Sequence, residues 1–301
     1  MSAPGPAPSA APPAGPPGRS LLSDAMRRMR RNKLAVTGGV VLVLLVIACF
    51  ALPALLGLDH ETTAPKLHNQ APSASAPFGT DNLGRDYLAR VLVGGQTSLL
   101  VGLIGAVVVV VIGAVYGAVS GYFGGWVDEV MMRVVDFLYG IPYMFLVVLI
   151  MLQFDDEDRG SNLPIFVALA AVQWLTMARI VRGQVLTLRE REYVLAARVT
   201  GASHARILFR HVLPNCMGPI VVYGTLTVPA VILLESFLSY LGLGKSLSWG
   251  VLVAEGVQGI NPVKMDWWLL AFPSGALALT LLSLNFLGDG LRDALDPRTR
   301  R

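Results

Sequence analysis

Charged residues are scarce in this chain, and long apolar runs separate the few that it has. Asp, Glu, Lys and Arg make up 15% of its 301 residues, whereas 54% are hydrophobic. Soluble globular domains carry about a quarter charged residues, so this composition excludes an ordinary soluble domain. It predicts an all-α polytopic membrane protein.

Residues that bind metals or carry out catalysis are also rare. Cys49 and Cys216 fall toward opposite faces of the expected membrane, which argues against a disulfide. Two separated cysteines and four scattered histidines do not make a metal site. The sequence contains no catalytic triad, no paired carboxylates in a plausible cleft and no phosphate-binding GxxxxGK[ST] loop. We therefore expect a chain that is not an enzyme and binds neither metal nor cofactor.

Six apolar runs are long enough to span a bilayer as helices. They cover residues 34–56, 97–116, 134–154, 163–180, 217–240 and 267–287. Around them we expect a disordered Pro- and Ala-rich tail (1–20), a basic amphipathic segment (21–33), an outer loop (57–96), a core (97–288) and a C-terminal tail (289–301). Pro142, Pro229 and Pro273 lie inside spans, where neighbouring helices can satisfy the freed carbonyls.

The distribution of basic residues predicts the orientation. With both termini in the cytosol, 18 of the 24 Lys and Arg residues lie on the inner side, and the outer loop at 155–158 is wholly acidic. This asymmetry follows the positive-inside rule. It also explains the net charge of +4 without nucleic acid, for which no basic patch interleaved with aromatics is present.

Gly113, Gly117 and Gly121 recur every four residues on one face of the second span. Such spacing lets another helix backbone approach closely. The partner is either a helix of this chain or a helix of a second subunit, and the sequence leaves both open.

The polar segment at 182–215 is the most informative part of the chain. Good helix formers extend to Val199, where Gly201 is expected to end the helix by taking the left-handed conformation. Ser203 can then cap a short amphipathic helix that carries Arg206 and ends before Leu213 and Pro214. The segment is expected to lie along the membrane surface.

Two acidic residues lie at or near membrane depth. Asp136 is close to the inner end of its span, where Arg133 could pair with it at i,i+3, and Glu235 is close to the outer end of the fifth span. Ionisable groups at this depth are candidates for the transport pathway or its gate.

Six stretches in order resemble the peptide and nickel group of ATP-binding-cassette (ABC) import permeases, with the C-type oligopeptide permease as the nearest pattern. They are FGTDNLGRDYLARVLVGGQTSLLVG from Phe78, SGYFGGWVDEVMMRVVDF from Ser120, WLTMARIVRGQ from Trp174, ESFLSYLGLG from Glu235, SWG from Ser248 and NFLGDGLRDALDPR from Asn285. The resemblance runs from about Leu21 to the end and implies the type I (MetI-like) permease fold.

The same resemblance assigns the 182–215 segment to ATPase docking. The matching positions are Ala196, Ala197, Gly201, Ala202, Ser203, Arg206, Leu213 and Pro214, with Glu192 standing in for a Glu that the family often has where this chain has Leu195. The implied partners are a B-type permease subunit, two ABC ATPases that use ATP and Mg, an extracytoplasmic binding protein and the bilayer of a bacterial inner membrane.

The implied cargo is a peptide, an oligopeptide first. A dipeptide or nickel-chelate importer of the same group is the alternative. An ion-coupled secondary transporter is the rival from another class, although it would want midplane acids and inverted repeats. An intramembrane enzyme would need a nucleophile and base at matching depth, and the sequence offers none.

Overall fold

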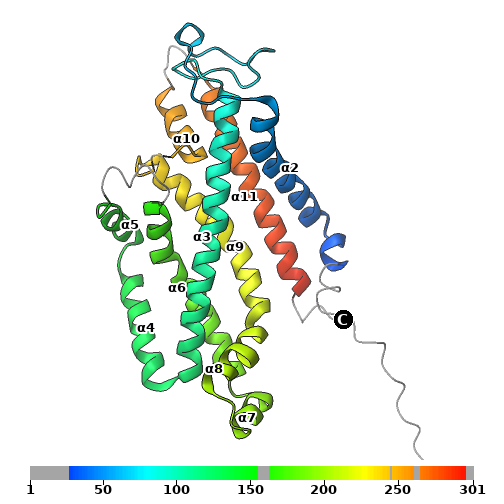
Figure 1. The fold of residues 1–301 in the computed structure, drawn as a ribbon, viewed down its shortest axis with the longest axis vertical. Coiled ribbons are helices and arrows are strands. Elements are labelled where there is room, and N and C mark those ends of the chain that lie inside the picture. Colours follow the sequence, from blue (N-terminus) through cyan, green and yellow to red (C-terminus); the bar gives the residue numbers. More distant parts are fainter. Residues whose placement is uncertain (1–26, 155–162, 245, 261–264, 296–301) are drawn as a thin grey trace, which may run out of the picture.

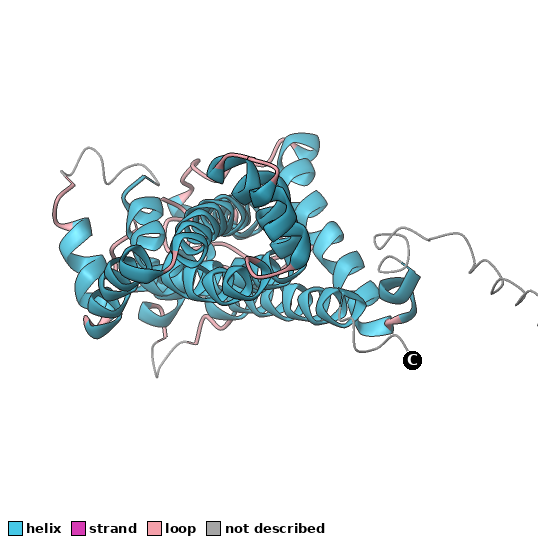
Figure 2. Ribbon diagram, turned by 90° about the horizontal axis from the view of Figure 1, so that it is seen from below, coloured by secondary structure: helices cyan, strands magenta, loops and turns pink. Residues whose placement is uncertain are grey.

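The computed structural model describes residues 27–154, 163–244, 246–260 and 265–295 as one elongated bundle of helices (Figure 1). Every described residue belongs to a helix or a loop, as the view along the bundle in Figure 2 also shows. The predicted tail at 1–20 and the acidic loop at 155–158 lie outside the described residues. The predicted all-α class is confirmed.

The α-helices of the described bundle follow a short helical stretch at 27–31. They are α2 (Lys33–Leu56), α3 (Tyr87–Phe123), α4 (Gly125–Gly140), α5 (Tyr143–Met151), α6 (Leu163–Leu188), α7 (Glu192–Val199), α8 (His204–Ile207), α9 (Met217–Tyr240), α10 (Trp249–Gln258) and α11 (Trp268–Leu295). Five stretches are long and apolar enough to cross a membrane, and the bent pair α4–α5 makes up to six. This agrees with the predicted number of spans.

Three spans extend beyond their predicted ends, among them α11, which continues from the predicted end at 287 to Leu295 and so includes part of the predicted C-terminal tail at 289–301. α3 begins at Tyr87 instead of residue 97, because Asp86 caps it by accepting a hydrogen bond from the Leu88 N–H (2.9 Å). α6 continues from the predicted end at 180 to Leu188, inside the polar segment at 182–215 whose first part was also expected to be helical. Hydropathy marks the part of a helix that lies in lipid, whereas capping marks where the helix ends.

The third predicted span, 134–154, is not one helix. α4 and α5 meet at an angle of 88° across the break that contains Ile141 and Pro142. Proline has no N–H to donate and disfavours helical geometry in the residue before it. By contrast, α9 and α11 continue through Pro229 and Pro273, as expected for prolines whose neighbours compensate.

The glycine stripe of α3 faces α6 of the same chain. A Cβ atom added to Gly113, Gly117 or Gly121 would lie only 2.2–2.8 Å from the nearest backbone or side-chain atom of α6. At Gly117 the nearest atom is the Ala178 carbonyl oxygen, at 2.2 Å. The α3–α6 interface is the most extensive helix pair in the bundle, and these glycines allow it.

We expect Gly117→Ala to destabilise the bundle by about 1–3 kcal/mol, because the new methyl group must push two packed helices apart. The measurement is the melting temperature of the detergent-solubilised protein. Gly183→Ala on α6 is the matched control, since its Cβ would meet nothing within 4 Å. Equal losses in both variants would contradict this packing role.

Buried side chains form three clusters along the bundle. One joins α3 and α6 to α7 and α8, a second lies among α3, α5, α6 and α9, and a third packs α10 and α11 against α2 and α3. α2 lies on α11 at the edge of the bundle (Figure 1). The first cluster anchors α7 and α8 on the bundle, and the second positions α5 against α6 and α9.

Candidate functional site

The chain between α6 and α9 forms a compact tip, here called the tip segment (189–216), at the end of the bundle opposite α10 (Figure 1). Gly201 ends α7 with a φ of 78°, and the Ser203 hydroxyl accepts a hydrogen bond from the Arg206 N–H (3.4 Å) at the start of α8. Both features were predicted. The predicted continuous helix over 182–199 was wrong, because a turn at 189–191 separates α6 from α7.

One side of the tip segment is anchored in the bundle. Val194, Ile207 and Val212 are fully buried in the cluster that also contains Tyr122 of α3 and Val185 of α6. Burial of an aliphatic side chain contributes about 1.5–3 kcal/mol, so this contact holds the segment as a rigid extension of α3 and α6.

The other side of the tip segment presents apolar groups to its surroundings. Val199 is 88% exposed, and Leu195 and Phe209 are 45% and 55% exposed. Of the predicted docking residues, Glu192, Ala196, Gly201, Ser203, Arg206 and Pro214 are exposed, and Ala197, Ala202 and Leu213 are half-buried. A rigid apolar surface rimmed by polar residues is typical of a protein–protein contact.

Two hydrogen bonds connect the tip segment to the end of α3. The Tyr122 hydroxyl lies 3.1 Å from Nδ1 of His204, and Arg189 donates from Nη1 to the Gly121 carbonyl (3.0 Å). The sequence analysis missed both contacts. Nothing in the sequence around His204 indicates that Tyr122, 82 residues away, is its partner.

Asp136 pairs with α6 and not with its own helix. Its carboxylate accepts a hydrogen bond from Arg179 (2.7 Å), whereas Arg133 lies 3.9 Å from Glu129, so the predicted Arg133–Asp136 pair was wrong. Asp136 is 58% exposed. Its role in the pathway or gate stays a prediction.

Glu235 is 1% exposed, and serine hydroxyls surround its carboxylate. Ser239 donates to it at 2.8 Å and Ser98 of α3 at 3.3 Å, while the Ser98 hydroxyl accepts from the backbone N–H of Trp249 at the start of α10 (3.2 Å). These bonds tie α3, α9 and α10 together. Its predicted part in the pathway also remains untested.

A buried ion-pair cluster lies at the α10 end. Arg90 donates a hydrogen bond to Asp81 (2.8 Å) and one from each terminal nitrogen to the Glu255 carboxylate of α10 (2.7 and 3.0 Å). Arg85 adds a contact to Asp81 (2.7 Å). Glu255 was missed, because 165 residues separate it from Arg90.

A partly open cavity of about 800 Å³ lies at the break between α4 and α5. Its walls come from the break, from the middle of α6 and from α9, and no lining residue in the described part of the chain is charged. The lining residues are Leu138, Tyr139, Ile141, Pro142, Tyr143, Val172, Gln173, Leu175, Thr176, Ala230, Leu233, Leu234 and Phe237.

The break also interrupts the hydrogen bonds of the main chain. The Ile141 N–H bonds the Leu138 carbonyl, and the next bond runs from the Phe145 N–H to the Pro142 carbonyl. Within the described residues, the carbonyls from Tyr139 to Ile141 therefore accept no main-chain hydrogen bond. Lipid does not tolerate unpaired backbone groups, so such a break is stable only inside protein or beside a water-filled cavity.

The helical bundle with its five to six candidate membrane spans agrees with the family comparisons. The family described as binding-protein-dependent transport system inner membrane component matches residues 113–301. The chain belongs to this family. A second family model, the N-terminal TM domain of oligopeptide transport permease C, matches residues 20–72 of this permease.

Curated relatives extend the similarity over nearly the whole permease. It is 48% identical to the oligopeptide transport system permease protein of Escherichia coli strain K12, over 94% of this chain and 93% of the relative. The corresponding protein of Haemophilus influenzae is 45% identical over 94% and 90%. The dipeptide transport system permease protein of Bacillus subtilis strain 168 is also 45% identical, over 94% and 87%.

Proposed function

We propose that this permease forms half of the path by which an ABC importer takes up peptides, oligopeptides first. The observation that carries the proposal is the cavity at the α4–α5 break. A span that opens its backbone at membrane depth needs protein, water or cargo beside it, and lipid supplies none of these. We therefore assign this face of the bundle, formed by α4, α5, α6 and α9, to the pathway.

The cavity lining suits a cargo whose side chains vary. Tyr139, Gln173 and Thr176 offer uncharged polar groups, and the open carbonyls at the break offer acceptors. Peptide main chains always present N–H donors, whatever their sequence. An uncharged wall neither repels nor retains charged side chains of the cargo. Such a wall favours the passage of peptides of many sequences over the selection of one sequence. The names of the relatives place oligopeptides first and dipeptides second.

The exposed side of the tip segment supports docking of a soluble ATPase. Val199, Leu195 and Phe209 need a partner to cover them, and the buried side of the segment passes force directly into α3 and α6. We propose that two ABC ATPases bind ATP and Mg, that this chain binds no cofactor and is not catalytic, and that a B-type permease forms the other half of the path. The tip segment then faces the cytosol, and the α10 end receives a binding protein.

The test is purification of this chain with its associated subunits in mild detergent, followed by an ATPase assay. Co-purifying ATPases, with hydrolysis stimulated by a peptide-loaded binding protein, are the expected result. Stimulation by tetra- and pentapeptides above dipeptides would support the oligopeptide assignment. A chain without associated ATPase, whose uptake depends on a proton gradient, would overturn the proposal in favour of an ion-coupled transporter.

A further inference from the structure

Three polar contacts bridge α4 and α6 at successive heights. Asp128 holds Arg182 through two bonds of 2.5 and 2.6 Å. Asp136 bonds Arg179 at 2.7 Å, and the Tyr139 hydroxyl lies 2.6 Å from the Thr176 hydroxyl. The Arg179 guanidinium also lies over the Tyr139 ring, 4.1 Å from its centre. Together these contacts form a row along the two helices.

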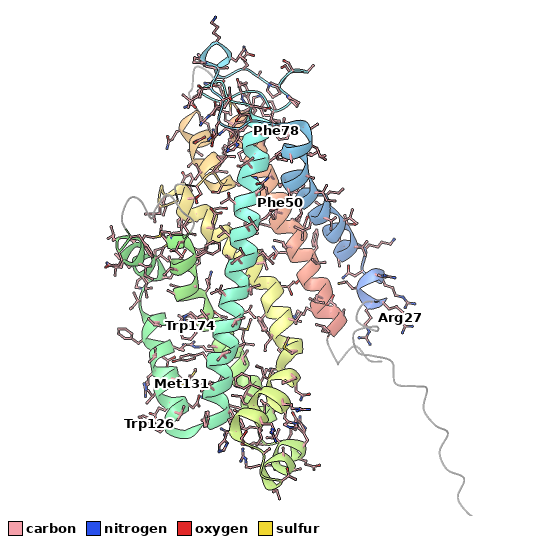
Figure 3. The ribbon with its side chains drawn as sticks, in the orientation of Figure 1. Arg27, Phe50, Phe78, Trp126, Met131 and Trp174 are labelled. Carbon is pink, nitrogen blue, oxygen red and sulfur yellow. The ribbon has the colours of Figure 1, made fainter. Side chains whose placement is uncertain are left out.

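Apolar packing contributes little to the position of α4. Val135 is its only buried residue among those described, and the helix runs along the edge of the bundle (Figure 1). Figure 3 shows Trp174 of α6 and Met131 of α4 in the region between α4 and α3. There the hydroxyl of Tyr116, a residue of α3, donates a hydrogen bond to the Met131 carbonyl (2.9 Å). The position of α4 therefore depends on side-chain hydrogen bonds and ion pairs.

One end of the row reaches the tip segment. Ser120 near the end of α3 donates to Asp128 (2.5 Å), and the next residues of α3 bond the tip segment through Gly121–Arg189 and Tyr122–His204. Direct contacts thus run from the tip segment to the end of α3 and to the first turn of α4.

The other end of the row reaches the cavity. Tyr139 and Thr176 both line it, and the α4–α5 break follows Tyr139 directly. Asp136 and Arg179 lie between the two ends and are absent from the cavity lining. They contact the element that shapes the pathway without contacting the pathway itself.

We propose that this polar ladder makes α4 and α6 move as one unit, so that movement of the docked tip segment is transmitted to the cavity at the α4–α5 break. Asp136 and Arg179 are positioning residues in the ladder. The proposal rests on the proposed function, in which a partner ATPase moves the tip segment. Asp136 and Arg179 are 58% and 45% exposed, so removal of one of them leaves no fully buried charge behind and does not disturb the buried packing. Loss of the pair should therefore alter coupling more than folding.

The test uses the complete complex with Asp136→Asn or Arg179→Gln in this chain. We expect peptide transported per ATP hydrolysed to fall by about 2- to 30-fold, the range for residues that carry coupling. ATP hydrolysis itself should continue. The charge-swapped double variant Asp136→Arg/Arg179→Asp should recover at least part of the ratio. Glu129→Gln is the matched control, since Glu129 is an exposed acid of the same helix that pairs only with Arg133.

A second readout does not depend on the cargo. Spin labels at Val130 of α4 and Gly183 of α6, placed by cysteine substitution after Cys49 and Cys216 are replaced by alanine, report the spacing of the two helices. We expect one narrow distance distribution with and without ATP in the labelled parent, and a broadened one after Asp136→Asn. If peptides are not transported but the labels behave in this way, the cargo assignment fails and the ladder stands. If Asp136→Asn leaves both the ratio and the distribution unchanged, the ladder is overturned.

Discussion

Gly201→Asp is expected to abolish ATP-driven uptake while the membrane bundle stays folded. Gly201 has a φ of 78°, which L residues rarely adopt, and it lies exposed between α7 and α8. A side chain at this point disturbs the angle between the two helices, and a carboxylate must lose its hydration if the partner covers it. No atom lies within 4 Å of the added Cβ, so the interior of the bundle is not disturbed.

The experiment compares uptake, protein level and co-purified ATPase for two aspartate variants. Gly57→Asp is the control, because Gly57 also has a positive φ of 59°, also has open space around it and lies at the end of α2. It shares the backbone strain and the added charge but is outside the tip segment. Normal uptake by Gly201→Asp at a normal protein level would contradict the docking assignment.

Arg90→Ala is expected to cause the largest loss of stability. Arg90 is 4% exposed and lies between Asp81, whose side chain is 3% exposed, and Glu255. Removing one partner of a buried ion pair costs about 3–5 kcal/mol, because the remaining charge loses its compensation without regaining water. Arg85 still pairs with Asp81, so we expect a loss of about 3 kcal/mol, or a fall of about 5 °C in melting temperature for a chain of this size.

Tryptophan fluorescence during thermal unfolding in detergent measures this effect, since Trp249 and Trp268 are buried in the cluster at the same end of the bundle. Arg85→Ala is the control. Arg85 is 20% exposed and contacts Asp81 alone, so its removal should cost much less. Similar losses for the two arginines would mean that the bidentate contact with Glu255 does not hold α10 in place.

The helices were predictable where hydrophobicity and capping act locally. The first and fifth spans were placed to within a residue of α2 and α9, because apolar runs coincide with those helices. The turn at Gly201 and the cap at Ser203 were also predicted, since a left-handed glycine and an N-terminal serine act on their own neighbours. Local rules failed at the α4–α5 break. Pro142 interrupts the third span, whereas Pro229 and Pro273 leave the helices α9 and α11 continuous.

The partners of the charged residues were not predictable. Asp136 was expected to pair with Arg133 three residues away, yet Arg179 of α6 bonds it instead. Glu235 could be recognised as a charge at membrane depth, but only the packed structure surrounds it with serines from two helices. The cavity needs the angle between α4 and α5 and the positions of α6 and α9, none of which a single sequence contains.

The sequence by itself determined that this protein is a helical membrane protein with a polar segment between its fourth and fifth spans. Apolar length, glycine spacing and capping residues are local quantities, and they suffice for that conclusion. Only the tertiary structure decided that the glycine stripe packs on α6, that Arg90 reaches Glu255 and that a row of polar contacts joins the tip segment to the cavity. Those contacts join residues far apart in the chain, and their energies depend on burial and distance, which exist only once the helices have packed.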